Sequence, residues 1–177
     1  TASGHLEVAG LARGSTLDFS CDTAVVTGTL TATGRGQAQD QGDGKGGYCG
    51  SNLGAGGAGH GGLGRGCSGS ASNGVGTTYG SAVLPWTYGS GGARQTNYSS
   101  NGGAGGGRVR LDCTGAVAHE GTLSADGAAG SGNSGVIGGG GGSGGSVQLH
   151  TANLTGAGTI TARGGNGGPQ QGGGGGG

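Results

Sequence analysis

Residues 147–164 read V-Q-L-H-T-A-N-L-T-G-A-G-T-I-T-A-R-G, and two earlier stretches of the chain repeat this phrase. Residues 17–34 read L-D-F-S-C-D-T-A-V-V-T-G-T-L-T-A-T-G, and residues 109–127 read V-R-L-D-C-T-G-A-V-A-H-E-G-T-L-S-A-D-G. Each copy has a strand of alternating apolar residues, a short bend, and then the motif Gly-Thr-(Leu/Ile)-(Ser/Thr)-Ala-x-Gly. A repeated unit that is too small to bury its own apolar face is typical of stacked coils.

The repeat predicts which side chains lie above one another. Equivalent residues of stacked parallel coils lie about 4.8 Å apart. We therefore expect Asp18 to lie over Arg110 and Asp112 over His150 on one face of the first strand. The second strand predicts one interior column, made of Leu30, Leu123 and Ile160. The fold class expected is all-β, a parallel β-helix, to which residues 5–11 add a shorter, incomplete strand.

Composition narrows the class of protein. Glycine accounts for 56 of the 177 residues, but Pro85 and Pro169 are the only prolines and no Gly-X-Y period occurs, which excludes collagen. Charged residues make up 9 % and the net charge is zero, so we expect no nucleic-acid partner. The chain has no run of 18 apolar residues, and we expect no membrane insertion. Because it begins at Thr1 and ends in the tract Gly172–Gly177, we expect a segment of a longer protein.

The whole chain, 1–177, is predicted to be a single segment with coils around 5–34, 108–127 and 146–164. A Gly-rich insertion, 35–107, separates the first copy from the second, and a Gly-rich tail covers 165–177. Insertions into stacked coils form loops between strands. These loops are either flexible coil or extended, left-handed threefold helices of the polyglycine-II kind, which only glycine allows to pack closely.

The four cysteines favour disulfides and an oxidising compartment. Cys21 and Cys113 occupy the same position of the repeat, while Cys49 and Cys67 both lie in the insertion. Of the three possible connectivities, geometry favours Cys21–Cys113 with Cys49–Cys67, although Cys21 and Cys113 could instead be small buried apolar residues. No C-x-x-C pair occurs, and we expect neither a metal nor a cofactor.

Threonines alternate on the face opposite the interior column. Outward-facing threonines on stacked coils could form a ladder that binds ice or carbohydrate, whereas their β-propensity alone also explains them. The candidate ladder consists of Thr29, Thr31, Thr122, Thr159 and Thr161.

Two further candidate sites follow from motifs. Asp18 and Asp112 could serve as the carboxylate pair of an enzyme that cleaves polysaccharides, but an exposed ladder of ion pairs explains them equally well. We therefore predict that the protein is not an enzyme. The sequons at Asn97 and Asn153 predict N-glycosylation.

Two glycine-rich motifs carry a resemblance. Residues 79–92 read Y-G-S-A-V-L-P-W-T-Y-G-S-G-G, and residues 140–149 read G-G-G-S-G-G-S-V-Q-L. Together with the repeat, they resemble the large glycine-rich β-helical repeat proteins of eukaryotic secreted and cell-surface chains. The resemblance implies an extracellular, right-handed β-helix that serves as a structural unit of a filament, appendage or coat. Because a stack of coils leaves unpaired strand edges at both ends, we expect its partners to be copies of itself or neighbouring β-helical segments, with glycans as further candidates.

Overall fold

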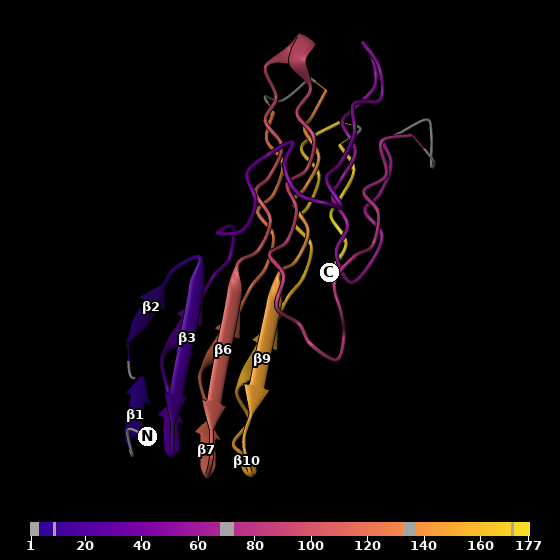
Figure 1. Ribbon diagram of the computed structural model, residues 1–177. Coiled ribbons are helices and arrows are strands. Elements are labelled where there is room, and N and C mark those ends of the chain that lie inside the picture. Colours follow the sequence, from indigo (N-terminus) through magenta and orange to yellow (C-terminus); the bar gives the residue numbers. More distant parts are fainter. Residues whose placement is uncertain (1–3, 9, 68–72, 133–136, 171) are drawn as a thin grey trace.

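The computed structural model describes residues 4–8, 10–67, 73–132, 137–170 and 172–177. Residues 68–72, in the predicted insertion, and residue 171, in the predicted tail, lie outside this part. The described chain is almost all β, and its single helical turn is η1 (Thr96–Tyr98). Its strands form three parallel sheets, and glycine-rich segments run side by side beyond one end of these sheets (Figure 1).

Each copy of the repeat forms three strands, one in each sheet. The first copy gives β3 (Thr16–Cys21), β4 (Thr23–Val26) and β5 (Thr29–Thr31). The second gives β6 (Arg108–Cys113), β7 (Ala116–His119) and β8 (Thr122–Ser124), and the third gives β9 (Ser146–His150), β10 (Asn153–Thr155) and β11 (Thr159–Thr161). Before them come β1 (His5–Val8) and β2 (Leu11–Arg13). The single incomplete strand expected at 5–11 is therefore β1 together with the first residue of β2.

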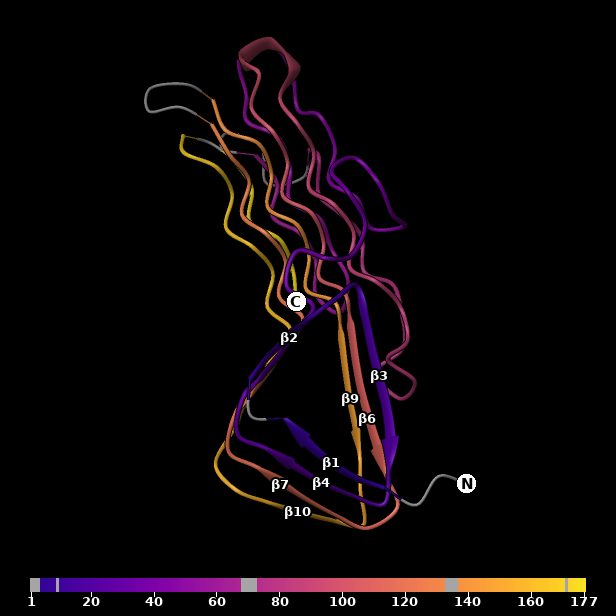
Figure 2. The same ribbon diagram turned by 90° about the vertical axis from the view of Figure 1, so that its left-hand side faces the viewer.

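The sheets have the orders β1-β4-β7-β10, β2-β5-β8-β11 and β3-β6-β9, and all these pairings are parallel. Seen along the stack, they lie on three sides of the core (Figure 2). The predicted alignment is confirmed, because Leu30 pairs with Leu123, which pairs with Ile160. Leu30 and Leu123 are fully buried, whereas Ile160, on the last strand of its sheet, is 46 % exposed.

The middle strand of each copy is an addition to the two strands expected from the sequence. Ala24 and Val26 of β4, and Val117 and His119 of β7, point into the core and are buried. These strands are only four residues long, which leaves room for two inward side chains each. Their alternation is too short to separate from a bend in the sequence.

The described glycine-rich segments are held in an ordered, hydrogen-bonded bundle. Successive N–H groups in 139–145 point to three different neighbouring segments, and every third residue returns to the same one. One neighbour is 125–131, whose Ser131, Ala128 and Ala125 carbonyls accept from Gly139, Gly142 and Gly145 in turn. The second is 90–93, where Ala93 and Ser90 accept from Gly140 and Ser143. The third is 173–176, where Gly173 and Gly176 accept from Gly141 and Gly144.

Carbonyl groups of the same segment accept hydrogen bonds from three further neighbours. The donors are the N–H groups of Gly103 and Gly106, of Gly165 and Gly168, and of Ala55 and Ala58. Segment 138–145 therefore contacts six others, a pattern that a β-sheet, with neighbours on two sides only, cannot provide.

Close approach of backbones explains why glycine fills this bundle. A Cβ atom added to Gly140 would overlap the carbonyl group of Gly56, and one added to Gly141 would overlap that of Gly165. The residues other than glycine that the bundle buries have small or polar side chains, such as Ala55, Ala58 and Ser143. The chain thus packs in two ways: apolar side chains fill the core between the sheets, whereas hydrogen-bonded backbones in close contact fill the glycine bundle.

Candidate functional site

Polar and charged side chains cover the outer face of the β3-β6-β9 sheet. Alternation places Leu111 and Cys113 of β6 in the core and leaves Arg108, Arg110 and Asp112 on the outside. The neighbouring strands contribute Asp18, Gln148 and His150 to the same face. This face holds the charged candidate residues that the sequence singled out.

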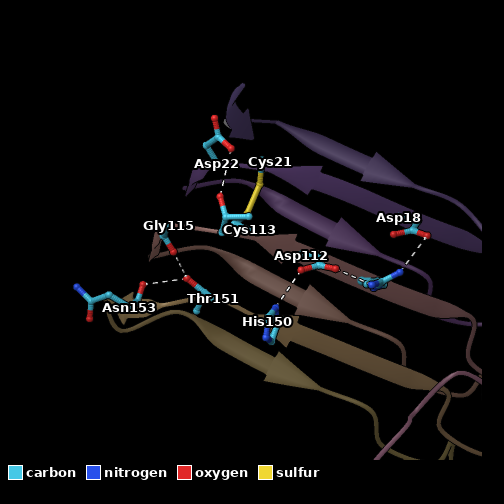
Figure 3. Close-up of polar contacts among 11 residues, drawn as sticks. Asp18, Cys21, Asp22, Asp112, Cys113, Gly115, His150, Thr151 and Asn153 are labelled. Atoms are coloured by element: carbon cyan, nitrogen blue, oxygen red, sulfur yellow. Dashed lines mark hydrogen bonds and ion pairs between the residues drawn. A yellow bond between two sulfur atoms is a disulfide. The ribbon is translucent and has the colours of Figure 1, made fainter. Parts of the chain in front are cut away.

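Asp18, Arg110, Asp112 and His150 form a continuous chain of polar contacts across three strands (Figure 3). An Nη2 hydrogen of Arg110 is donated to Asp112 at 2.6 Å, and Arg110 Nη1 lies 4.0 Å from the carboxylate of Asp18. His150 Nδ1 lies 3.0 Å from Asp112 Oδ1. The predicted stacking of Asp18 on Arg110 and of Asp112 on His150 is confirmed by the strand register.

These contacts stabilise the ionised form of Asp112. The hydrogen bond with His150 and the charge of Arg110 lower the pKa of Asp112, although desolvation opposes them. A general acid that cleaves a glycosidic bond requires a raised carboxyl pKa. Asp112 therefore does not suit the role of the general acid, and its contacts with Arg110 and His150 form an ion-pair ladder.

An aromatic loop, for which the sequence predicted no site, lies against the same face. The Cζ atom of Arg108 lies 4.4 Å from the ring centroid of Trp86 and 4.1 Å from that of Tyr88. Arg110 approaches the Trp86 ring at 5.5 Å. Cations at such distances are attracted to the faces of aromatic rings. The only sequence signal was the Val83-Leu84-Pro85-Trp86 run, an apolar stretch in a polar, glycine-rich segment.

A depression of about 370 Å³ opens between this loop and the sheet. Leu84 and Trp86 line it from the loop, and Arg110 and Gln148 line it from β6 and β9; we call it the Trp86 depression. Trp86 is 39 % exposed. The site thus combines an accessible indole ring with a guanidinium and an amide group.

A second depression, of about 490 Å³, borders the other side of the loop. His60 lies in its wall, with Nε2 2.6 Å from the Thr87 hydroxyl and its ring edge against Tyr79. Burial lowers the pKa of His60, although a backbone hydrogen bond with Gly145 opposes this shift. Because its ring already bonds to Thr87, His60 supports the loop.

The threonine ladder is in register but is not uniformly open. Thr29, Thr122 and Thr159 pair in sequence, as do Thr31, Ser124 and Thr161. Ser124 donates its hydroxyl hydrogen to Thr31 Oγ1 at 2.8 Å, and both side chains are buried. The ladder therefore uses part of its hydrogen-bonding capacity internally. In the other row, Thr29 and Thr122 are half-buried and Thr159 is exposed.

The cysteines form two disulfides, Cys21–Cys113 and Cys49–Cys67. The first bond joins directly opposed residues of β3 and β6 (Figure 3). The second closes a loop of the glycine-rich insertion. These are the two pairs that the sequence favours among the three possible connectivities.

Both sequon asparagines lie at the surface. Asn97 is exposed in η1, where its Nδ2 donates to the carbonyl of Ser51 at 3.3 Å. Asn153 is exposed at the first position of β10. A glycan at Asn97 would replace one of the two Nδ2 hydrogens and leave the other to donate to Ser51.

Within the described ranges, no group of three or more His, Cys, Asp and Glu side chains is placed to hold a metal ion. In the same part of the chain, no helix has the length and apolar character needed to cross a bilayer. Comparison with known proteins finds no family model, no curated protein and no solved structure that matches this chain.

Proposed function

We propose that this chain is an extracellular structural protein, a non-enzymatic unit of a filament, surface appendage or coat that assembles by stacking coil upon coil. The observation that carries the proposal is the open end of the stack. Within the described part of the chain, strands β9, β10 and β11 pair on one side only, and each ends its sheet. Unpaired edges of parallel strands accept another strand readily.

Apolar side chains accompany the unpaired backbone at this end. Leu154 of β10 is 50 % exposed and Ile160 of β11 is 46 % exposed, although both continue columns that are buried in the preceding coil. A further coil would bury both residues and pair the free N–H and C=O groups. The partner that fits best is a further β-helical segment, either of another copy or of a longer chain.

The strand path supports a right-handed parallel β-helix as the architecture of the unit. Each strand pairs with its counterpart in the next copy of the repeat, which is the order that a coiled path produces. Crossover connections between parallel strands of one sheet are almost always right-handed. The resemblance to glycine-rich β-helical repeat proteins implies the same architecture.

The glycine bundle supports the structural role. Its return to the same neighbour at every third residue suits a polyglycine-II-like packing of threefold helices. Each backbone in such a bundle is hydrogen-bonded on all sides, which gives a stiff element without a hydrophobic core. Two disulfides favour an oxidising, extracellular environment.

The test is a comparison of assembly between the wild-type chain and an end-coil variant, Leu154→Lys with Ile160→Lys. Two buried charges would oppose addition of a coil. We expect wild-type protein to form concentration-dependent linear oligomers by negative-stain microscopy and sedimentation, and the variant to stay monomeric. A matched control, Tyr48→Lys with Leu63→Lys, changes two exposed side chains outside β9, β10 and β11 and should assemble normally. Dispersed wild-type monomers at every concentration would contradict the proposal.

A further inference from the structure

The loop beside the β3-β6-β9 sheet exposes apolar side chains that the core does not need. Val83 is 86 % exposed and Leu84 is 70 % exposed, and the next apolar residue, Trp86, is also accessible. Adjacent exposed apolar residues of this size often mark a binding surface. The loop lies over the outer face of the β3-β6-β9 sheet and not in the interior columns that a further coil would bury, so coil addition does not account for these side chains.

The loop is held rigidly in place by the sheet beneath it. Arg108 donates from Nη1 to the Trp86 carbonyl at 2.9 Å, and Ser146 donates to the Thr87 carbonyl at 2.8 Å. Arg108 Nη2 also donates to the Tyr88 hydroxyl at 2.9 Å. Three successive loop residues are thus fixed to β6 and β9. Fixing a loop before binding lowers the entropy that a ligand must overcome.

The Trp86 depression has one apolar side and one polar side. Its volume of about 370 Å³ falls within the range of small-molecule pockets. Leu84 and the indole of Trp86 form the apolar side. Opposite them, the Gln148 amide makes no hydrogen bond to any residue that the structure describes, and its donor and acceptor remain available.

Charge decides between an acidic and a neutral ligand. Arg110 is already paired with Asp112 and lies near Asp18, and these two carboxylates balance the charges of Arg110 and Arg108. An acidic ligand would meet no net positive charge here and would lie close to two carboxylates. A neutral ligand with many hydroxyl groups avoids this repulsion and can still bond to the amide and the guanidinium.

We propose that the Trp86 depression binds one neutral pyranose unit of a polysaccharide. The apolar face of the sugar ring packs on Trp86 and Leu84, and ring hydroxyls bond to the Gln148 amide and to Arg110. The structural unit then also anchors to a glycan matrix, at a site separate from the threonine ladder, on the outer face of the sheet that β9 ends. All the residues that line the site belong to one chain, so it is tested on the monomer at low concentration and its test does not depend on the proposed function.

The single tryptophan of the chain is Trp86, and its fluorescence therefore reports on this site alone. The test titrates the full chain with the neutral hexasaccharides of glucose, mannose and xylose, and with a hexagalacturonate. We expect a saturable change in tryptophan fluorescence with at least one neutral sugar and a weaker response or none with the acidic one. No saturable response to any neutral sugar, or a preference for the galacturonate, would overturn the proposal.

Two variants that keep Trp86 connect the response to the depression. Gln148→Ala and Leu84→Ser each change an accessible side chain and leave the loop anchors intact. Each should weaken binding about tenfold, the loss that corresponds to one hydrogen bond or a modest apolar contact. Leu63→Ser, at an equally exposed leucine outside the site, should bind like the wild type. Unchanged affinity in both site variants, with folding verified by circular dichroism, would refute the assignment.

Discussion

Leu30 and Leu123 occupy opposed positions on β5 and β8, and both side chains are fully buried. Ile160 continues their column on β11 but is partly open to solvent. Neighbouring coils thus share one narrow core, in which each large side chain packs on its counterpart in the next coil. Stability should therefore depend strongly on a few such residues.

The first prediction concerns this column. Leu123→Ala removes a buried side chain between two coils and should lower the free energy of unfolding by about 2–5 kcal/mol. Chemical denaturation followed by circular dichroism measures the change. Leu154→Ala, at a half-exposed leucine of the end coil, is the matched control and should cost less than about 1 kcal/mol. Equal losses in the two variants would contradict a core confined to the inner coils.

The second prediction concerns the glycine bundle. Gly140→Ala places a methyl group against the Gly56 carbonyl, and relieving this overlap should cost about 1–3 kcal/mol or more. Gly174→Ala is the control, because the nearest atom to its added Cβ is 3.7 Å away. It should be neutral or stabilising by up to about 1 kcal/mol, since alanine restricts the unfolded chain. A flexible bundle would tolerate both substitutions equally.

The sequence predicted those features that a repeat records directly. The three aligned copies identified the Leu30 column, the opposition of Cys21 and Cys113, and the stacking of Asp18 on Arg110, because residues at equal repeat positions lie side by side in parallel strands. The middle strands were missed since β4 and β7 each have only two inward residues.

Other features depend on contacts that no repeat records. Trp86 contacts Arg108, which lies 22 residues further along the chain, and no sequence motif links the two positions. The glycine tracts fit flexible coil and ordered bundle equally well, because glycine has no side chain whose pattern could distinguish the two. The backbone hydrogen bonds of the glycine-rich segments, such as those of 138–145, distinguish the two.

The third prediction compares the two disulfides. Cys21–Cys113 joins residues 92 positions apart, whereas Cys49–Cys67 joins residues 18 apart. In the chain-entropy account, removing the longer link costs about 4–5 kcal/mol and the shorter about 3 kcal/mol. We therefore expect Cys21→Ala with Cys113→Ala to lower the thermal midpoint more than Cys49→Ala with Cys67→Ala. Scanning calorimetry measures both, and the reverse order would show that strain or residual structure outweighs loop entropy.

The fourth prediction concerns acid and Asp112. Its pKa in the folded chain is lowered by the hydrogen bond with His150 and by the charge of Arg110, so ionised Asp112 favours folding above the pKa of the unfolded chain, about 3.9. This contribution is lost as the pH falls through the lower, folded pKa. The Asp112→Asn variant lacks this contribution at every pH. The difference in free energy of unfolding between wild type and variant should therefore shrink as the pH falls from about 5 to about 2.

Denaturant titrations at several pH values across this window measure that difference. Glu7→Gln is the control, because Glu7 is exposed and has no ion pair among the described residues, and its difference from wild type should change little with pH. A gap between wild type and Asp112→Asn that stays constant, or widens in acid, would show that the Asp112 contacts do not favour the ionised carboxylate. In that case the charged ladder across β3, β6 and β9 would contribute geometry to the Trp86 depression but no stability to the stack.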